Sequence, residues 1–454
     1  MNTPRAPWIV SLTLATLTLA LPCGCSFGVF SELADKAPAA RLEVDGASSF
    51  GDHLVGLARG GTDRGGLLAI TGNGGPTFAL STISGSASLS QADGADLKDQ
   101  LNDPNRITSM AAAPSETAVG SAQGPFVYIG SITGAMGSVR VLDVSTVRQI
   151  RVYKAPIQPI QVTDFGASVV RADLGGGGTG DDLAVGATNT LALMRADGSG
   201  GRAWPDMLED QAGNNQAALI QGDVDWPTGS FSVIAAGDLD NATPEHEVAA
   251  AVPEKNAVVV VHHVANCFQD TSVVCKTVLR IPLPSQAVGF GKALLIADVD
   301  NDGKAELVVG APDADRVYVY DLDSTHFDPV TPAAPPTPIT LSTSDSEAGD
   351  FGSSLALGKI DSGAKNLLVV GAPGSVASGS ANAGKLYLFD SALKQVGDGV
   401  QLADPEGGTL MGRRLAVIPY RSGTQTLDLL AASGKTSVFV FFANLTSGHK
   451  DIRD

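Results

Sequence analysis

The feature that most constrains the fold is an internal repeat with a period of roughly sixty residues, which runs from residue 50 almost to the C-terminus. A copy contains a Phe-Gly pair, a short apolar segment, an acidic or glycine-rich loop, an apolar segment that ends in Gly-Ala-Pro, and an alternating segment. One clear copy is FGKALLIADVDNDGKAELVVGAPDADRVYVYD, from residue 290. Extending the spacing predicts seven copies, which begin at Phe50, Met110, Phe165, Phe231, Phe290, Phe351 and Met411. Such repetition predicts copies of one supersecondary unit packed against each other.

Each copy predicts β-strands rather than helices. The segment Val317–Tyr320 alternates β-branched and aromatic residues, which is typical of a strand. Four strands are expected in each copy, the fourth lying just before the next Phe-Gly pair, as in TPITLS from Thr337. Glycine and proline, 53 and 25 of 454 residues, supply the turns. A four-stranded unit buries both of its faces when copies pack radially, so we expect an all-β, seven-bladed β-propeller of four-stranded antiparallel blades.

The two ends of the repeat array predict how the ring closes. The last copy has three obvious strands, and the segment ARLEVDG from Ala40 has no copy of its own. We expect this N-terminal segment to complete the seventh blade, because an open ring would leave unpaired strand edges. The predicted propeller therefore spans residues 39–447, with a C-terminal tail over residues 448–454.

The loop DVDNDGKAE predicts a calcium site. Asp298, Asp300 and Asp302 alternate along the chain before Gly303, and Glu306 follows. Calcium takes six to eight oxygen ligands, largely carboxylates and carbonyls, so we expect these four carboxylates and the carbonyl of Lys304 to bind it. An EF-hand is excluded, since its twelfth position is Val309, within an expected strand.

The equivalent loops of other copies are degenerate. DLDNATPEHE keeps Asp238 and Asp240, but Ala242 replaces the third aspartate and an extra residue shifts Glu247, so at most weak binding is expected. GKIDSGAKN keeps only Asp361, and ADLGGGGTGDD has Asp173, Asp181 and Asp182 across a glycine run. We expect no metal at these last two loops.

The Phe-Gly and Gly-Ala-Pro pairing with an acidic loop between them resembles the FG-GAP repeat of the integrin α-subunit propeller and related bacterial proteins. The resemblance implies a propeller whose acidic loops bind structural calcium on one face. It also implies that a protein or carbohydrate partner binds loops on the opposite face or on the rim. No ligand-binding residue of that family transfers to a position of this chain.

The N-terminus has the features of an export signal. Arg5 is followed by an uncharged run from Ala6 to Leu21, which is short for a membrane span. The run ends in LPCGCS, which resembles a bacterial lipoprotein signal with Cys25 as the lipidated residue; simple cleavage is the alternative. We therefore expect a signal peptide over residues 1–25, a linker over residues 26–38, and a location in the cell envelope, at the outer membrane or cell surface, with a lipid anchor as the only membrane contact.

Two cysteines remain after the signal, Cys267 and Cys275, and their spacing predicts a local disulfide in an oxidising compartment, with buried free thiols as the alternative. The formal net charge of −18 argues against nucleic acid as a partner. The run Gly175–Gly180 satisfies a dinucleotide-binding pattern, but a strand-like segment follows where a helix is required, so no nucleotide is expected.

We therefore expect a calcium-stabilised binding or adhesion module without catalytic residues, whose partner is a protein or glycan at the propeller loops. Two alternatives stay open. A hydrolase or lyase would gather histidine, carboxylate or arginine side chains around the central channel. A lectin would repeat aromatic and polar pockets between blades, although aromatic residues make up only 5% of the chain.

Overall fold

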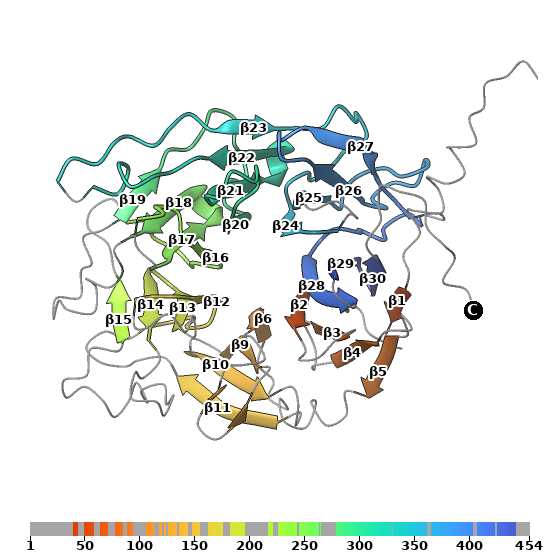
Figure 1. The fold of residues 1–454 in the computed structure, drawn as a ribbon, viewed down its shortest axis with the longest axis horizontal. Helices are drawn as coiled ribbons and strands as arrows, with labels where there is room; N and C mark the ends of the chain where they lie inside the picture. Colours follow the sequence, from red (N-terminus) through yellow and green to blue (C-terminus); the bar gives the residue numbers. More distant parts are fainter. Residues whose placement is uncertain are drawn as a thin grey trace, which may run out of the picture.

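The computed structural model is built from antiparallel β-sheets that are arranged around a central axis (Figure 1). It describes residues 40–43, 50–58, 64–70, 78–84, 89–93, 106–112, 118–119, 122–123, 126–133, 136–143, 148–154, 162–175, 182–195, 217–220, 226–242, 245–262, 264, 278–328, 330–360, 365–402, 406–422 and 425–441. In this part of the chain, no helix is long and apolar enough to cross a membrane.

Seven four-stranded antiparallel sheets occur among the described residues, and in most of them the strand order follows the chain. The sheets are β2 (His53–Ala58), β3 (Arg64–Ile70), β4 (Phe78–Ser84), β5 (Leu89–Asp93); β6 (Arg106–Ala112), β9 (Phe126–Thr133), β10 (Met136–Asp143), β11 (Arg148–Lys154); β12 (Ser168–Ala172), β13 (Asp182–Ala187), β14 (Thr190–Met194), β15 (Ala217–Ile220); β16 (Val233–Gly237), β17 (Glu247–Val252), β18 (Ala257–Val261), β19 (Val278–Ile281); β20 (Ala293–Ala297), β21 (Glu306–Ala311), β22 (Arg316–Tyr320), β23 (Ile339–Leu341); β24 (Ser354–Gly358), β25 (Leu367–Ala372), β26 (Lys385–Phe389), β27 (Gln395–Val400); and β28 (Leu415–Ser422), β29 (Gln425–Ser433), β30 (Ser437–Phe441) with β1 (Ala40–Glu43). The protein is thus an all-β propeller with four-stranded antiparallel blades, as the repeat predicted.

The second strand of each blade explains the continuous apolar runs of the sequence. In β21, Leu307 and Val309 pack in a cluster shared with the preceding blade, whereas Val308 packs in a cluster shared with the following blade. All six residues of this strand are buried. Because both faces of the sheet are covered by neighbours, the strand loses the polar alternation of a half-exposed sheet.

The Phe-Gly pair joins one blade to the next. Phe351 is fully buried and packs against Val317 of the preceding blade and Tyr387 of its own. A Cβ added to Gly310 would lie 2.1 Å from the carbonyl oxygen of Gly352, which itself has φ +99°. The glycine of Gly-Ala-Pro therefore makes room for the backbone of the next Phe-Gly pair, and a larger residue in either position would separate the blades.

The first strands of the blades line the axis and contact each other in turn (Figure 1). The contacting pairs are β2 with β6, β6 with β12, β12 with β16, β16 with β20, β20 with β24, β24 with β28, and β28 with β2. The N-terminal strand β1 pairs antiparallel with the last strand, β30, in the register Ala40↔Val440 to Glu43↔Ser437. The predicted pairing of the segment at Ala40 with the final sheet is confirmed.

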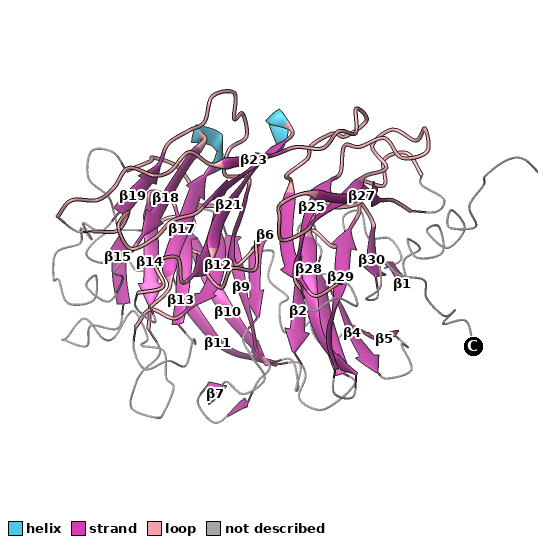
Figure 2. Ribbon diagram, turned by 45° about the horizontal axis from the view of Figure 1, so that its top comes forward, coloured by secondary structure: helices cyan, strands magenta, loops and turns pink. Residues whose placement is uncertain are grey.

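The two ends of the ring carry different connections (Figure 2). The Phe-Gly pairs precede the first strands, and the short 3-10 helices η1 (Pro253–Lys255) and η2 (Pro312–Ala314) follow the second strands. Since these strands are antiparallel, both features lie at one end, which we call the FG end. The connections from first to second strands, which include the acidic loop 298–305, lie at the opposite end, which we call the loop end.

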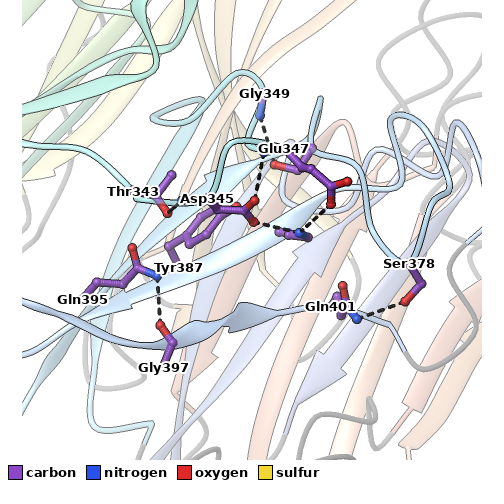
Figure 3. A network of polar contacts seen from close by, with 11 residues as sticks. Thr343, Asp345, Glu347, Gly349, Ser378, Tyr387, Gln395, Gly397 and Gln401 are labelled. Carbon is purple, nitrogen blue, oxygen red and sulfur yellow. Dashed lines mark hydrogen bonds and ion pairs between the residues drawn. The ribbon is translucent and has the colours of Figure 1, made fainter.

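A partly buried polar tie holds the connection between two of the blades (Figure 3). Asp345 lies in the connection from β23 to β24 and accepts hydrogen bonds from Lys385 Nζ at 2.7 Å and from the Tyr387 hydroxyl at 2.8 Å. The backbone N–H of Glu347 also donates to Asp345 at 2.9 Å, and the Asp345 N–H donates to the Thr343 hydroxyl at 3.1 Å. The connection between blades is thereby held against the third strand of the following blade.

One predicted repeat boundary is wrong. Met110 was expected to begin the second copy, but it lies inside β6, which already starts at Arg106. This copy lacks the Phe-Gly pair that marks four of the other copies, so its start was assigned from the spacing and an apolar residue alone, and the assignment was wrong. It also carries a short extra hairpin, β7 (Ala118–Val119) with β8 (Ala122–Gln123).

Candidate metal centre

The acidic loop at residues 298–305 connects β20 to β21 at the loop end. The pair Ala297↔Glu306 closes the two strands, so the loop starts and returns at the same point. Asp298, Asp300 and Glu306 each offer a carboxylate oxygen, and these oxygens lie within 4.8 Å of one another. Three of the predicted calcium ligands are thus brought together. Asp302 and Lys304 lie in the same loop with exposed side chains, outside this group of three.

Backbone N–H groups orient the carboxylates of this loop. Asp298 accepts hydrogen bonds from the N–H of Asp302 at 3.1 Å and of Gly303 at 3.0 Å. Asp300 accepts a second bond from Asp302 at 3.0 Å, and Asp302 accepts one from Lys304 at 2.8 Å. Gly303 has φ +95°, so the predicted need for glycine at the turn is confirmed.

Glu306 is the buried member of the group and is only 4% exposed. Its Oε2 accepts the Val299 N–H at 2.8 Å. Burial raises the pKa of Glu306 to about 7; the Val299 bond opposes this, and the negative charges of Asp300, Asp302 and Asp298 add to it. Burial also raises the pKa of Asp300, against the Asp302 hydrogen bond and with repulsion from Asp302, Asp298 and Asp321. Crowded carboxylates of this kind favour a bound cation.

The residues fit a calcium ion. The donors are hard oxygens, which calcium prefers, and the loop supplies further carbonyl and carboxylate oxygens beside the group of three. Two carboxylates about 4 Å apart repel by roughly 4 kcal/mol at a surface-like dielectric, so a divalent cation would remove a large unfavourable term. A bound ion would cross-link the ends of β20 and β21, which is a structural role.

A second group of carboxylates has the same arrangement in the preceding blade. Asp238, Asp240 and Glu247 also bring carboxylate oxygens within 4.8 Å of one another. Glu247 opens β17, pairs with Gly237, and accepts the Leu239 N–H at 2.8 Å, as Glu306 does with Val299. Burial raises the pKa of Glu247 to about 8; hydrogen bonds from Leu239 and Asp240 oppose the rise, whereas the charges of Asp240 and Asp238 add to it.

The sequence did not indicate how closely this second group matches the first, and the expectation of at most weak metal binding there stays a prediction. Counting residues made the loop seem broken, because an extra residue precedes Glu247 and Ala242 replaces an aspartate. The structure absorbs the extra residue in the loop and keeps Glu247 as the first residue of the second strand. The useful signal is therefore an acidic residue directly before the apolar run, not a fixed distance from the first aspartate.

In a third blade, an arginine that follows the third strand contacts the corresponding loop. Asp182 opens β13 and accepts the Leu174 N–H at 2.8 Å, the bond that Glu247 and Glu306 make in their blades. The Arg195 guanidinium donates from Nε to the Leu174 carbonyl at 2.9 Å and also from Nη2. Burial lowers the pKa of Arg195, and the nearby charges of Asp182, Glu245 and Asp173 act in the opposite direction.

Arg195 thus supplies positive charge beside the carboxylates of this loop. The expectation of no metal at this loop stays a prediction. The strand predicted after the glycine run is confirmed, since β13 begins at Asp182.

Several predicted features lie outside the described residues. They are the signal and linker over residues 1–38, the tail over residues 448–454, the candidate lipidation residue Cys25, the candidate disulfide Cys267 with Cys275, and the loop residue Asp361. They stay predictions.

Comparison with known protein families identifies the repeat. Residues 290–321 match the family model described as the FG-GAP repeat. The matched segment covers β20, the acidic loop, β21 and β22, together with the first residue after β22. No curated protein matches the chain. The match supports the fold family that the sequence resemblance indicated, an FG-GAP repeat in a β-propeller.

Proposed function

We propose that this chain is a calcium-stabilised, exported binding module of the cell envelope, with a seven-bladed ring closed by its N-terminal strand. The observation that carries the proposal is the pair of matching carboxylate groups, Asp298–Asp300–Glu306 and Asp238–Asp240–Glu247, on an FG-GAP propeller. The calcium ions are structural and the ring acts by binding a protein or glycan, not by catalysis.

Contacts within the ring support seven blades and closure. The first strands of the seven sheets contact their neighbours in sequence, including β28 with β2, the last with the first. The antiparallel pairing of β1 with β30 adds the fourth strand to the final sheet. A ring held by strands from both ends of the repeat array resists opening at the seam, as a rigid display scaffold requires.

The enzyme alternative predicts histidine, carboxylate or arginine side chains around the central channel, and this expectation can be compared with the residues at the FG end. Asp52, His53 and Arg413 do gather there, as an enzyme at the channel would require. However, Asp52 is paired with Arg413 at 2.9 Å and His53 Nε2 lies 3.0 Å from the Ile107 carbonyl. These contacts hold the side chains at the FG end, and substrate turnover decides between a binding surface and a catalytic one. The export signal, with Cys25 at its end, supports the envelope location.

Calcium stoichiometry tests the proposal. The mature chain, residues 26–454, is freed of metal with a chelator and titrated calorimetrically with calcium. We expect two ions per chain, with Glu306→Gln and Glu247→Gln each removing one. Lys359→Gln, which changes an exposed residue outside both groups, is the control and keeps two. Absence of calcium binding by the folded wild type would refute the calcium part of the proposal.

Binding is tested separately on the calcium-loaded chain. A glycan array and a panel of glycoside and ester substrates distinguish the lectin, the enzyme and the protein-binding module. Selective retention of one glycan class would favour the lectin alternative. Turnover of a substrate that is abolished by Asp52→Asn would overturn the non-catalytic proposal.

A further inference from the structure

A large polar cavity opens on the ring axis at the FG end. Its volume is about 1080 Å³, and residues at the starts of first strands contribute to it from every blade. Representative lining residues are His53, Thr108, Ala167, Val233, Lys292 and Ser353. The cavity is distinct from both carboxylate groups, because those lie at the loop end of the same blades.

Positive charge is concentrated on one side of this cavity. Lys292, Arg413 and Arg414 line it from the blades that begin with β20 and β28, and Ser353 of the blade between them lies in the same arc. Lys292 is paired with Asp313 at 2.6 Å, and Arg413 with Asp52 at 2.9 Å. Two of the three cations are therefore balanced by neighbouring carboxylates.

Arg414 differs from the other two cations. Its side chain is exposed, and its guanidinium donates from Nη1 to the neutral Arg413 carbonyl at 3.2 Å. Within the described part of the chain, no carboxylate forms an ion pair with it. The guanidinium thus retains donors for a ligand and is not held in an ion pair within the described part of the chain.

The backbone holds this arginine in place. The Arg414 N–H donates to the Ser433 hydroxyl at 3.0 Å, and the Ser433 N–H donates to the Arg414 carbonyl at 2.9 Å. Ser433 is fully buried at the end of β29. The residue that carries this guanidinium is therefore fixed at the start of β28, facing a cavity with room for a small molecule.

We propose that the FG-end cavity binds the oxyanion group, a carboxylate, sulfate or phosphate, of a small acidic solute through the Arg414 guanidinium. The inference rests on the proposed function as a binding module, and it adds the site and the ligand class. A guanidinium presents parallel N–H donors that match such oxyanions. Asp164 lines the same cavity, which favours a compact anion over a long polyanion. The overall charge of −18 makes general attraction of anions unfavourable, so binding depends on this local site.

Anion titration of the calcium-loaded mature chain tests this inference. Sodium sulfate, sodium phosphate and sodium citrate are each titrated at constant ionic strength, with sodium chloride as the balancing salt. We expect saturable binding of at least one of the three, by calorimetry and as a rise in melting temperature. Arg414→Gln should weaken that binding at least tenfold, whereas Lys359→Gln, which removes one positive charge from an exposed site near the loop end, should leave it unchanged.

A second variant covers the case in which Arg414→Gln folds poorly. Arg414→Lys keeps the charge but loses the forked donors, so an intermediate affinity is expected. The inference is overturned if no anion saturates the wild type, or if both Arg414 variants bind with wild-type affinity. A rise in melting temperature that grows linearly with sulfate and is equal in all variants would be a general salt effect and would also overturn it. Calcium binding without anion binding would refute this inference alone; anion binding without calcium would refute only the calcium proposal.

Discussion

At the scale of single residues, an acidic side chain at the start of the second strand orients the loop end in each of three blades. Glu306, Glu247 and Asp182 each open a second strand and accept the N–H of the residue after the first aspartate of their loop. The three loops differ in the group that can balance their negative charge. Two loops gather further carboxylates suited to a metal ion, and the third uses Arg195.

Asp300→Ala tests the metal loop. In saturating calcium, loss of one ligand should lower the free energy of unfolding by up to about 2.7 kcal/mol, the linkage term for a ligand at one hundred times its dissociation constant. In excess chelator the variant should match the wild type or exceed its stability, because a repulsive charge is removed. The measurement is thermal or urea unfolding in both conditions. An equal loss of stability in chelator would contradict a role in metal binding.

Arg195→Met tests the arginine of the third blade. The substitution leaves Asp182 and Asp173 without their cation and the Leu174 carbonyl without its donor, so we expect a loss of about 2 kcal/mol. Since Arg195 supplies the positive charge at this loop, we expect the same loss in calcium and in chelator. Arg195→Lys should recover part of it. A loss that disappears on adding calcium would show that this loop also takes a metal.

At the scale of elements, burial on both faces explains which strands were predictable. The second strands, such as Leu367–Ala372, are apolar throughout and were expected from the sequence, and their residues are buried. The first strand of the second blade was misplaced, since no Phe-Gly pair marks its start at Arg106. The connections between blades were not predicted at all, although Asp345 forms a specific tie within one of them.

Asp345→Asn tests this tie through its pH dependence. Burial alone would raise the pKa of Asp345, but hydrogen bonds from Lys385, Glu347 and Tyr387 outweigh it and hold the pKa below the usual range. A carboxylate with a depressed folded-state pKa contributes stability above its unfolded pKa, near 4, and that stability is lost as the pH falls through the folded value.

The variant should therefore be less stable than the wild type by about 1–3 kcal/mol at pH 7, and the difference should shrink as the pH falls below about 4. Urea unfolding between pH 7 and pH 2.5 measures it. Asp323→Asn is a useful comparison, because Asp323 also has a lowered pKa but lies on an exposed turn. A difference that stays constant down to pH 2.5 would contradict an ionised Asp345 as the source of the tie.

At the scale of the whole molecule, the seam between the last and the first blade carries the most sequence-distant contacts. The strand β1 pairs with β30, and Arg413 next to β28 bonds to Asp52 next to β2. Bringing together residues this far apart in sequence costs loop-closure entropy, which the contacts at the seam must offset. The seam is therefore expected to govern cooperative unfolding.

Deleting residues 39–46 tests the proposed closure. Without β1, β30 would keep one unpaired edge, so we expect a lower unfolding midpoint and a greater tendency to aggregate. Removal of eight residues from the preceding linker, 26–33, is the matched control and should have no effect. Thermal unfolding and light scattering are the measurements. Unchanged stability of the first deletion would refute the closure by β1.

The sequence alone was sufficient for the fold class, the four-stranded unit and the pairing of the segment at Ala40 with the final sheet, because these follow from a repeated local pattern of apolar runs and glycine turns. It also identified Asp298, Asp300 and Glu306, whose spacing is local. Only the tertiary structure joined Asp240 to Glu247 across an irregular loop, brought Arg195 to Leu174, and collected Arg413, Arg414 and Lys292 around one cavity. The physical reason is that these groups come from different strands or blades, and only the packing of the sheets sets the distances between them.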